Sequence, residues 1–169
     1  ECDIHQTVVK GEKWTILVGL LHGKPYEVMG GLSTFVEIPK KYITGTLIKH
    51  PRKTMNSKYD LEFGENGDEI VIKDLVKVFD NPNNSAFTRL ISLSLRHGAP
   101  IQYVVEQMQK DRDSDMFSFA RCVSRVLKNY IKDGTEASDK VCPSCKAEDG
   151  LVYMEGCLTC TNCGYAKCG

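Results

Sequence analysis

No stretch of this chain approaches 18 consecutive apolar residues, so the sequence excludes a membrane-spanning helix. An excess of charge is also absent, because 22 Lys and Arg residues balance 22 Asp and Glu residues. Zero net charge argues against a nucleic-acid-binding protein that works by bulk electrostatics. No Gly-rich phosphate loop, G-x-S-x-G motif or catalytic carboxylate pair stands out. The chain has no signal peptide and begins with Glu1 instead of Met, so we expect a fragment of a longer protein.

Cysteine is abundant, with eight residues, but unevenly distributed. Cys2 and Cys122 stand alone, whereas the other six lie between Cys142 and Cys168. A secreted disulfide-rich domain would spread its cysteines over the whole chain. Clustered C-x-x-C pairs are instead typical of a metal site in a reducing compartment. We therefore expect a cytoplasmic protein.

The first half of the chain has the alternation and turn signals of strands, and the second half has the apolar spacing of helices. This order predicts an α+β fold, in which an antiparallel sheet is followed by helices and a small C-terminal zinc ribbon. Turns are expected at His22-Gly23 and at Asn66-Gly67, where tight turns need positive φ angles. The strand candidates are residues 14–18, 26–29, 35–38, 43–48, 59–63 and 69–75.

Three helices are expected after the strands. The first begins after the cap candidates at 83–85 and stops at Gly98, and the second starts at Pro100. The third carries an apolar stripe from Phe117 to Ile131, after a charged break at 111–115. Residues 134–139 lack an apolar period and are interpreted as a mobile linker. We therefore predict an α+β domain at 1–133, a linker at 134–139 and a zinc ribbon at 140–169.

Four cysteines form two C-x-x-C knuckles, and these predict a zinc site. Each knuckle presents two thiolates on one side of a tight loop, and zinc prefers four such ligands in a tetrahedron. A ribbon of 30 residues buries too little apolar surface to fold alone, so the metal would supply its folding free energy. The predicted ligands are Cys142, Cys145, Cys160 and Cys163.

Cys157 and Cys168 remain, and the spacing leaves their role open. They flank the second knuckle almost symmetrically, so they could face each other across a short antiparallel pair and form a disulfide. They could also be two further buried thiols. In a rival partition Cys157 and Cys160 form the second knuckle, which leaves Cys163 and Cys168 as a C-x4-C pair. We prefer the first partition because Gly164 relieves the backbone after Cys163.

Six segments resemble the C-terminal region of adenosylcobalamin-dependent (class II) ribonucleotide reductases, and they are distributed over nearly the whole chain. The most specific segment is the cysteine-rich tail. The segments are EGCLTCTNCGYAKC at 155–168, DMFSF at 115–119 leading to KNYIKDG at 128–134, GEKW at 11–14, VGLLHGKPYE at 18–27 and RLISLSLRHG at 89–98.

This resemblance implies an oxidoreductase, a ribonucleoside-diphosphate reductase, that converts ribonucleotides to deoxyribonucleotides for DNA replication. Its α/β barrel, its cobalamin contacts and its ribonucleotide site have no counterpart in this chain. The resemblance implies that a C-terminal cysteine pair relays reducing equivalents from thioredoxin or glutaredoxin to the barrel. On this basis Cys157 and Cys168 are the candidate redox-active residues, and the chain is a part of the enzyme that lacks its catalytic barrel.

The alternative is a binding module, in which the zinc ribbon contacts a protein or a nucleic acid. A nucleic-acid-binding ribbon should carry basic and aromatic residues on its hairpin. Residues 140–169 contain three lysines, no arginine and three acidic residues, so nucleic acid is a poor candidate. The two surplus cysteines are unnecessary for binding, but a thiol relay requires them.

Overall fold

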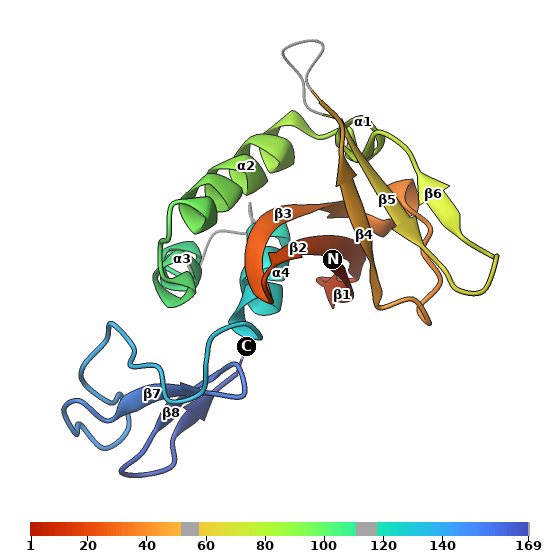
Figure 1. Ribbon diagram of the computed structural model, residues 1–169. Coiled ribbons are helices and arrows are strands. Elements are labelled where there is room, and N and C mark those ends of the chain that lie inside the picture. The colour runs from red at the N-terminus through yellow and green to blue at the C-terminus, as the bar shows by residue number, and fades with distance from the viewer. Residues whose placement is uncertain (52–57, 111–117, 169) are drawn as a thin grey trace. The chain divides into compact units, whose positions relative to one another are not determined.

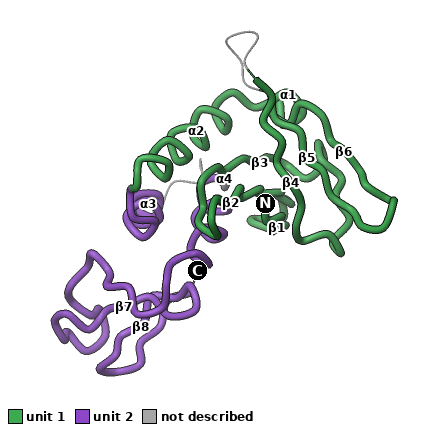
Figure 2. The backbone as a smooth tube through the Cα atoms, in the orientation of Figure 1, with its two compact units in different colours: residues 1–98 green, residues 99–169 purple. Residues whose placement is uncertain are grey.

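The structure is a computed structural model that describes residues 1–51, 58–110 and 118–168. It contains an antiparallel sheet, helices and a small cysteine-bearing sheet, so the predicted α+β class is confirmed. The chain divides into two compact units, residues 1–98 and residues 99–169 (Figure 2). No helix among the described residues is both long enough and apolar enough to cross a membrane.

The first unit contains a six-stranded antiparallel sheet with the strand order β3-β2-β1-β4-β5-β6 (Figure 1). The N-terminal strand β1 lies inside the sheet, where it pairs with β2 on one side and with β4 on the other. The sequence analysis did not predict β1. The strands are β1 Cys2–Val9, β2 Glu12–Leu21, β3 Lys24–Leu32, β4 Thr44–Lys49, β5 Tyr59–Phe63 and β6 Ile70–Ile72.

Both predicted turns join neighbouring strands. His22 and Gly23 connect β2 to β3 with φ angles of 51° and 73°, and Asn66 and Gly67 connect β5 to β6 at 57° and 94°. The strand predicted at 35–38 is wrong. A short 3-10 helix, η1 Ser33–Phe35, occupies its start, and Val36 and Ile38 follow as irregular chain whose side chains are nevertheless buried.

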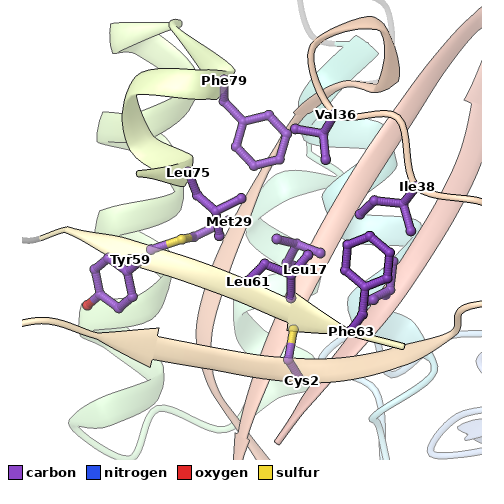
Figure 3. Close-up of a cluster of buried hydrophobic side chains, with 11 residues drawn as sticks. Cys2, Leu17, Met29, Val36, Ile38, Tyr59, Leu61, Phe63, Leu75 and Phe79 are labelled. Atoms are coloured by element: carbon purple, nitrogen blue, oxygen red, sulfur yellow. The ribbon is translucent and has the colours of Figure 1, made fainter. Parts of the chain in front are cut away.

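One face of this sheet carries a cluster of buried hydrophobic side chains (Figure 3). Alternate residues point to the same face of a strand, and the burial of β5 follows this period. The helix α1, Leu75–Phe79, covers the core with its two end residues. The core members are Cys2, Ile4, Leu17, Met29, Val36, Ile38, Tyr59, Leu61, Phe63, Leu75 and Phe79.

The helix α2, Pro82–Arg96, packs along β3, which is an edge strand of the sheet. An edge strand leaves backbone groups without a partner in the sheet, and Ser92 of α2 satisfies one of them. Its Oγ accepts a hydrogen bond from the Val28 amide at 2.9 Å and lies 3.3 Å from the Val28 carbonyl oxygen. The helix is capped by Asn81, whose side chain accepts from the Asn84 amide, and not by the residues predicted at 83–85.

The second unit contains α3, Ile101–Met108, and α4, Ser118–Lys128, which pack on each other. The chain turns between α2 and α3 at Gly98, whose φ of 81° agrees with the predicted helix stop. Residues 111–117, which include the predicted charged break and Phe117, lie outside the described residues. A three-stranded sheet follows, in the order β7-β8-β9, with β7 Leu151–Met154, β8 Cys157–Cys160 and β9 Ala166–Lys167.

Residues 134–137, which we predicted to be part of a mobile linker, lie along the free edge of β7. The Gly134 and Ala137 amides donate to the carbonyl oxygens of Tyr153 and Leu151, and the Tyr153 amide donates to Thr135. This segment therefore forms an additional hydrogen-bonded edge of the ribbon. The two compact units divide the chain after residue 98. The domain boundaries at 133 and 140 stay a prediction.

Candidate metal centre and disulfide

The two C-x-x-C knuckles have matching backbone geometry. In the first, the Lys146 amide donates to the Cys142 carbonyl at 3.0 Å, and in the second the Gly164 amide donates to the Cys160 carbonyl at 2.9 Å. The residue that follows the second cysteine of each knuckle has a left-handed backbone conformation, with φ of 61° at Lys146 and 73° at Gly164. Glycine adopts this region without strain, which is the role that the sequence indicated for Gly164.

The knuckles bring four thiols together at the end of the ribbon. The Sγ atoms of Cys142, Cys145, Cys160 and Cys163 all lie within 4.8 Å of one another. Two of these distances, Cys142 to Cys163 and Cys145 to Cys160, are 3.8 Å. A tetrahedron with zinc–sulfur bonds of about 2.3 Å has sulfur–sulfur edges of about 3.8 Å. The four side chains can therefore hold a metal ion such as zinc.

At one of the four cysteines, hydrogen bonds to sulfur favour the thiolate form that a metal requires. At Cys145, the Ala147 backbone amide and then the Asn162 side-chain amide lower the pKa of the thiol to about 6. The Asn162 nitrogen lies 3.6 Å from the Cys145 sulfur. Two of the four cysteines, Cys142 and Cys160, are buried, whereas Cys145 and Cys163 are exposed. A metal at this site would have one side in the ribbon and one side toward solvent.

The remaining two cysteines of the tail, Cys157 and Cys168, form a disulfide with a Cα–Cα distance of 4.2 Å. The sheet register explains the pairing. Leu158 pairs with Lys167 and Thr159 with Ala166, so continuing this antiparallel register by one position aligns Cys157 with Cys168. Cys168 is exposed and Cys157 is half-buried.

The disulfide and the thiol cluster share β8 but lie on opposite faces of it. Cys157 and Cys160 are the two ends of this strand, three residues apart. Side chains alternate between the faces of a strand, so an odd separation directs these two sulfurs to opposite sides. The disulfide therefore shares no side chain with the thiol cluster.

The ribbon is attached to the helices of its own unit through Glu106 of α3. This carboxylate accepts hydrogen bonds from the Ser138 amide and hydroxyl and from the Tyr153 hydroxyl, the last at 3.2 Å. Burial, followed by the charge of Glu106, raises the pKa of Tyr153. The sequence analysis missed Glu106, because a single acidic residue on a helix carries no local signal for a contact 47 positions away.

The comparison with protein families decides what kind of domain this is. A family model described as the NrdJ homologue C-terminal domain matches residues 1–132. The chain belongs to this family. The match confirms the resemblance to a C-terminal region of class II ribonucleotide reductase. It covers all of the first unit and both helices of the second, whereas the ribbon is assigned from its cysteines alone.

Searches of curated proteins and of solved structures found no match. The family membership of residues 1–132 and the geometry of the six tail cysteines are therefore the observations on which a function can be built.

Proposed function

We propose that this chain is the C-terminal part of a cytoplasmic, adenosylcobalamin-dependent ribonucleoside-diphosphate reductase, and that Cys157 and Cys168 relay reducing equivalents to its active site. The observation that carries the proposal is the Cys157–Cys168 disulfide beside a separate four-thiol cluster, in a chain of the NrdJ homologue C-terminal domain family. Cobalamin supplies radical chemistry in such an enzyme and would bind outside this chain.

Zinc has a structural role in this proposal. Cys142, Cys145, Cys160 and Cys163 would hold the ion, and four protein ligands leave no open position for a substrate. The ion would fix the two knuckles and, through β8, the position of Cys157. The ligand thiolates are poor relay candidates, because their oxidation would release the metal.

The relay step is a thiol–disulfide exchange. A thiolate of reduced thioredoxin or glutaredoxin attacks the sulfur of Cys168, which is the more exposed of the pair. The Cys157–Cys168 bond breaks, a mixed disulfide forms, and Cys157 leaves as a thiolate that takes up a proton. The second thiol of the reductant then attacks the mixed disulfide and releases Cys168. The pair has gained two electrons and two protons, which it passes to an oxidised cysteine pair of the barrel by the reverse chemistry.

The 169-residue chain allows a direct test of the first half of this relay. With thioredoxin, thioredoxin reductase and NADPH, the oxidised chain should consume one equivalent of NADPH and keep its zinc. Cys157→Ser and Cys168→Ser should consume none. The matched control, Cys122→Ala, changes a buried cysteine in α4 and should still consume one equivalent.

In the full-length enzyme, Cys157→Ser or Cys168→Ser should abolish multiple turnovers with thioredoxin. A small dithiol such as dithiothreitol can enter the barrel directly and should restore them. Normal turnover of both variants with thioredoxin would rule out this pair as the relay. The rival pair, Cys163 and Cys168, predicts that Cys163→Ser keeps its zinc and loses turnover, whereas Cys157→Ser loses the metal.

The binding-module alternative makes a different prediction. If the ribbon contacts a protein or a nucleic acid and has no redox role, substitution of Cys168 leaves turnover with thioredoxin unchanged. The geometry gives this alternative no specific support, because binding by the ribbon does not require an accessible disulfide on the face opposite the thiol cluster.

A further inference from the structure

We infer that the first unit contains a binding site for a small phosphorylated organic molecule, in a pocket between β3, α1 and α2. The pocket has a volume of about 460 Å³, which is in the range of small-molecule sites. All the residues that line it belong to the first unit. The proposal does not rest on the relay, which concerns the second unit.

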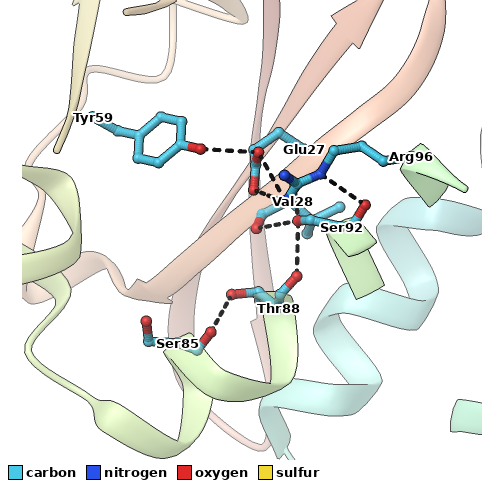
Figure 4. A network of polar contacts seen from close by, with 7 residues as sticks. All are labelled: Glu27, Val28, Tyr59, Ser85, Thr88, Ser92 and Arg96. Atoms are coloured by element: carbon cyan, nitrogen blue, oxygen red, sulfur yellow. Dashed lines mark hydrogen bonds and ion pairs between the residues drawn. The ribbon is translucent and has the colours of Figure 1, made fainter. Parts of the chain in front are cut away.

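The polar floor of the pocket is a pre-organised network (Figure 4). Glu27 of β3 is 8% exposed, and it accepts a hydrogen bond from the Tyr59 hydroxyl at 3.1 Å. Arg96 of α2 lies 3.4 Å from the same carboxylate oxygen, and its Nε donates to the Ser92 carbonyl at 3.1 Å. Burial, followed by the Glu27 charge, raises the pKa of Tyr59 to about 12, so this hydroxyl remains a donor at neutral pH. The network neutralises Glu27 within the pocket.

The remaining charge of the pocket is positive. The second acidic residue, Asp74, lies 3.9 Å from Lys58, so it too has a cationic partner. Three further cations line the pocket from three elements: Lys49 of β4, Lys77 of α1 and Arg89 of α2. Within the described part of the chain, none of these three forms an ion pair with a carboxylate. Three cations that face one hollow without acidic partners create a site for an anion.

The positive charge of the pocket and its apolar lining together indicate which type of anion it binds. A phosphate monoester carries about two negative charges at neutral pH, and a diphosphate carries more. Arg89 donates a hydrogen bond from Nη2 to the Ser85 hydroxyl at 3.0 Å, and the remaining N–H groups of its planar guanidinium can bind two phosphate oxygens. Met29, Val76 and Phe79 add an apolar wall, which inorganic phosphate would not use. The pocket therefore fits a ligand that has both a phosphate group and an apolar or planar part.

The test uses three probes on the 169-residue chain: ADP, inorganic pyrophosphate and adenosine. Calorimetric titration at fixed ionic strength should give a Kd for ADP below about 1 mM, with pyrophosphate weaker and adenosine weaker still. Failure of ADP to bind would overturn the proposal. Equal affinity for ADP and pyrophosphate would overturn the role of the apolar wall.

Single-charge variants locate the site. Arg89→Gln and Lys77→Gln should each weaken ADP binding by about tenfold, since each removes a charge-assisted contact. The control, Lys24→Gln, removes the same charge at an exposed position of β3 outside the pocket and should leave the affinity unchanged. An equal loss in all three variants would show non-specific attraction of an anion and would overturn the proposal. Circular dichroism of each variant shows whether the fold is intact.

Discussion

On the six-stranded sheet of the first unit, one buried cluster alone has eleven members, whereas the three-stranded sheet of the ribbon buries few apolar side chains among the described residues. In the ribbon, Leu151 and Tyr153 of β7 are buried, and Ala137 lies beside them. Two of the other buried side chains are Cys142 and Cys160, which belong to the thiol cluster. We therefore expect the two sheets to depend on different interactions: the first on burial of apolar surface, and the second on its disulfide and on a metal ion held by the four thiols.

Metal removal should have the largest effect on stability, and it should unfold one sheet and leave the other intact. Structural zinc contributes an apparent free energy of about 10–16 kcal/mol in small zinc domains, more than the ribbon's apolar burial can replace. A chelator under reducing conditions should therefore unfold residues 140–168 and leave residues 1–98 folded. Amide hydrogen exchange followed by NMR reports both regions.

Cys160→Ser should have the same consequence as the chelator, because it removes a ligand. The matched control, Cys168→Ser, changes the disulfide and should keep one zinc per chain. Full zinc content in Cys160→Ser, measured by elemental analysis, would indicate another ligand set.

The second prediction concerns the apolar core of the first unit. Leu61 on β5 is fully buried in the core of the first unit. Leu61→Ala leaves a cavity, and the free energy of unfolding of this unit should fall by about 2–5 kcal/mol. Denaturant titration measures the loss, and zinc content should not change. Val71→Ala, on the neighbouring strand β6 at 45% exposure, is the control and should have little effect.

The third prediction concerns the attachment of the ribbon to α3. Glu106→Ala removes the acceptor for Ser138 and Tyr153, so hydrogen exchange at 134–139 should become faster. A net effect of about 1–2 kcal/mol is expected for these hydrogen bonds, with the metal retained. Gln107→Ala changes the next, exposed residue of the same helix and serves as control. Unchanged exchange in Glu106→Ala would show that the backbone pairing with β7 alone holds this segment.

The smallest effect is expected at Asp60 on β5. The Asp74 backbone amide donates to it at 2.8 Å and His50 lies at 2.7 Å, and these contacts lower the pKa of the Asp60 carboxyl. A carboxyl whose pKa is lowered by folding stabilises the protein above its unfolded pKa, and this contribution is lost as pH falls through the folded value. Asp60→Asn should therefore reduce stability at pH 7 by less than about 1 kcal/mol, and the difference between the two proteins should shrink as the pH is lowered into the acid range and falls through the folded pKa of the carboxyl. Thermal unfolding of both proteins across this pH range checks the sign.

Local features of the molecule could be read from the sequence. Two cysteines three positions apart make a knuckle, Asn66-Gly67 supplies the positive φ angles of a tight turn, and Gly98 ends a helix. Each depends on residues within a few positions of one another, because a turn or a knuckle is closed by its own backbone hydrogen bonds. The metal-ligand candidates and the α+β class therefore followed from spacing alone.

Tertiary structure decided the features that join distant segments. Only the sheet register aligns Cys157 with Cys168, and only the packing of α2 on β3 places Arg96 beside Glu27, 69 positions earlier. The position of β1 inside the sheet and the pairing of 134–137 with β7 are of the same kind. Such contacts are selected by which arrangement buries the most apolar surface and satisfies the most backbone groups, and this selection involves the whole fold. The sequence by itself determined the thiol chemistry of the tail, whereas the fold decided which thiols pair and where the charged pocket lies.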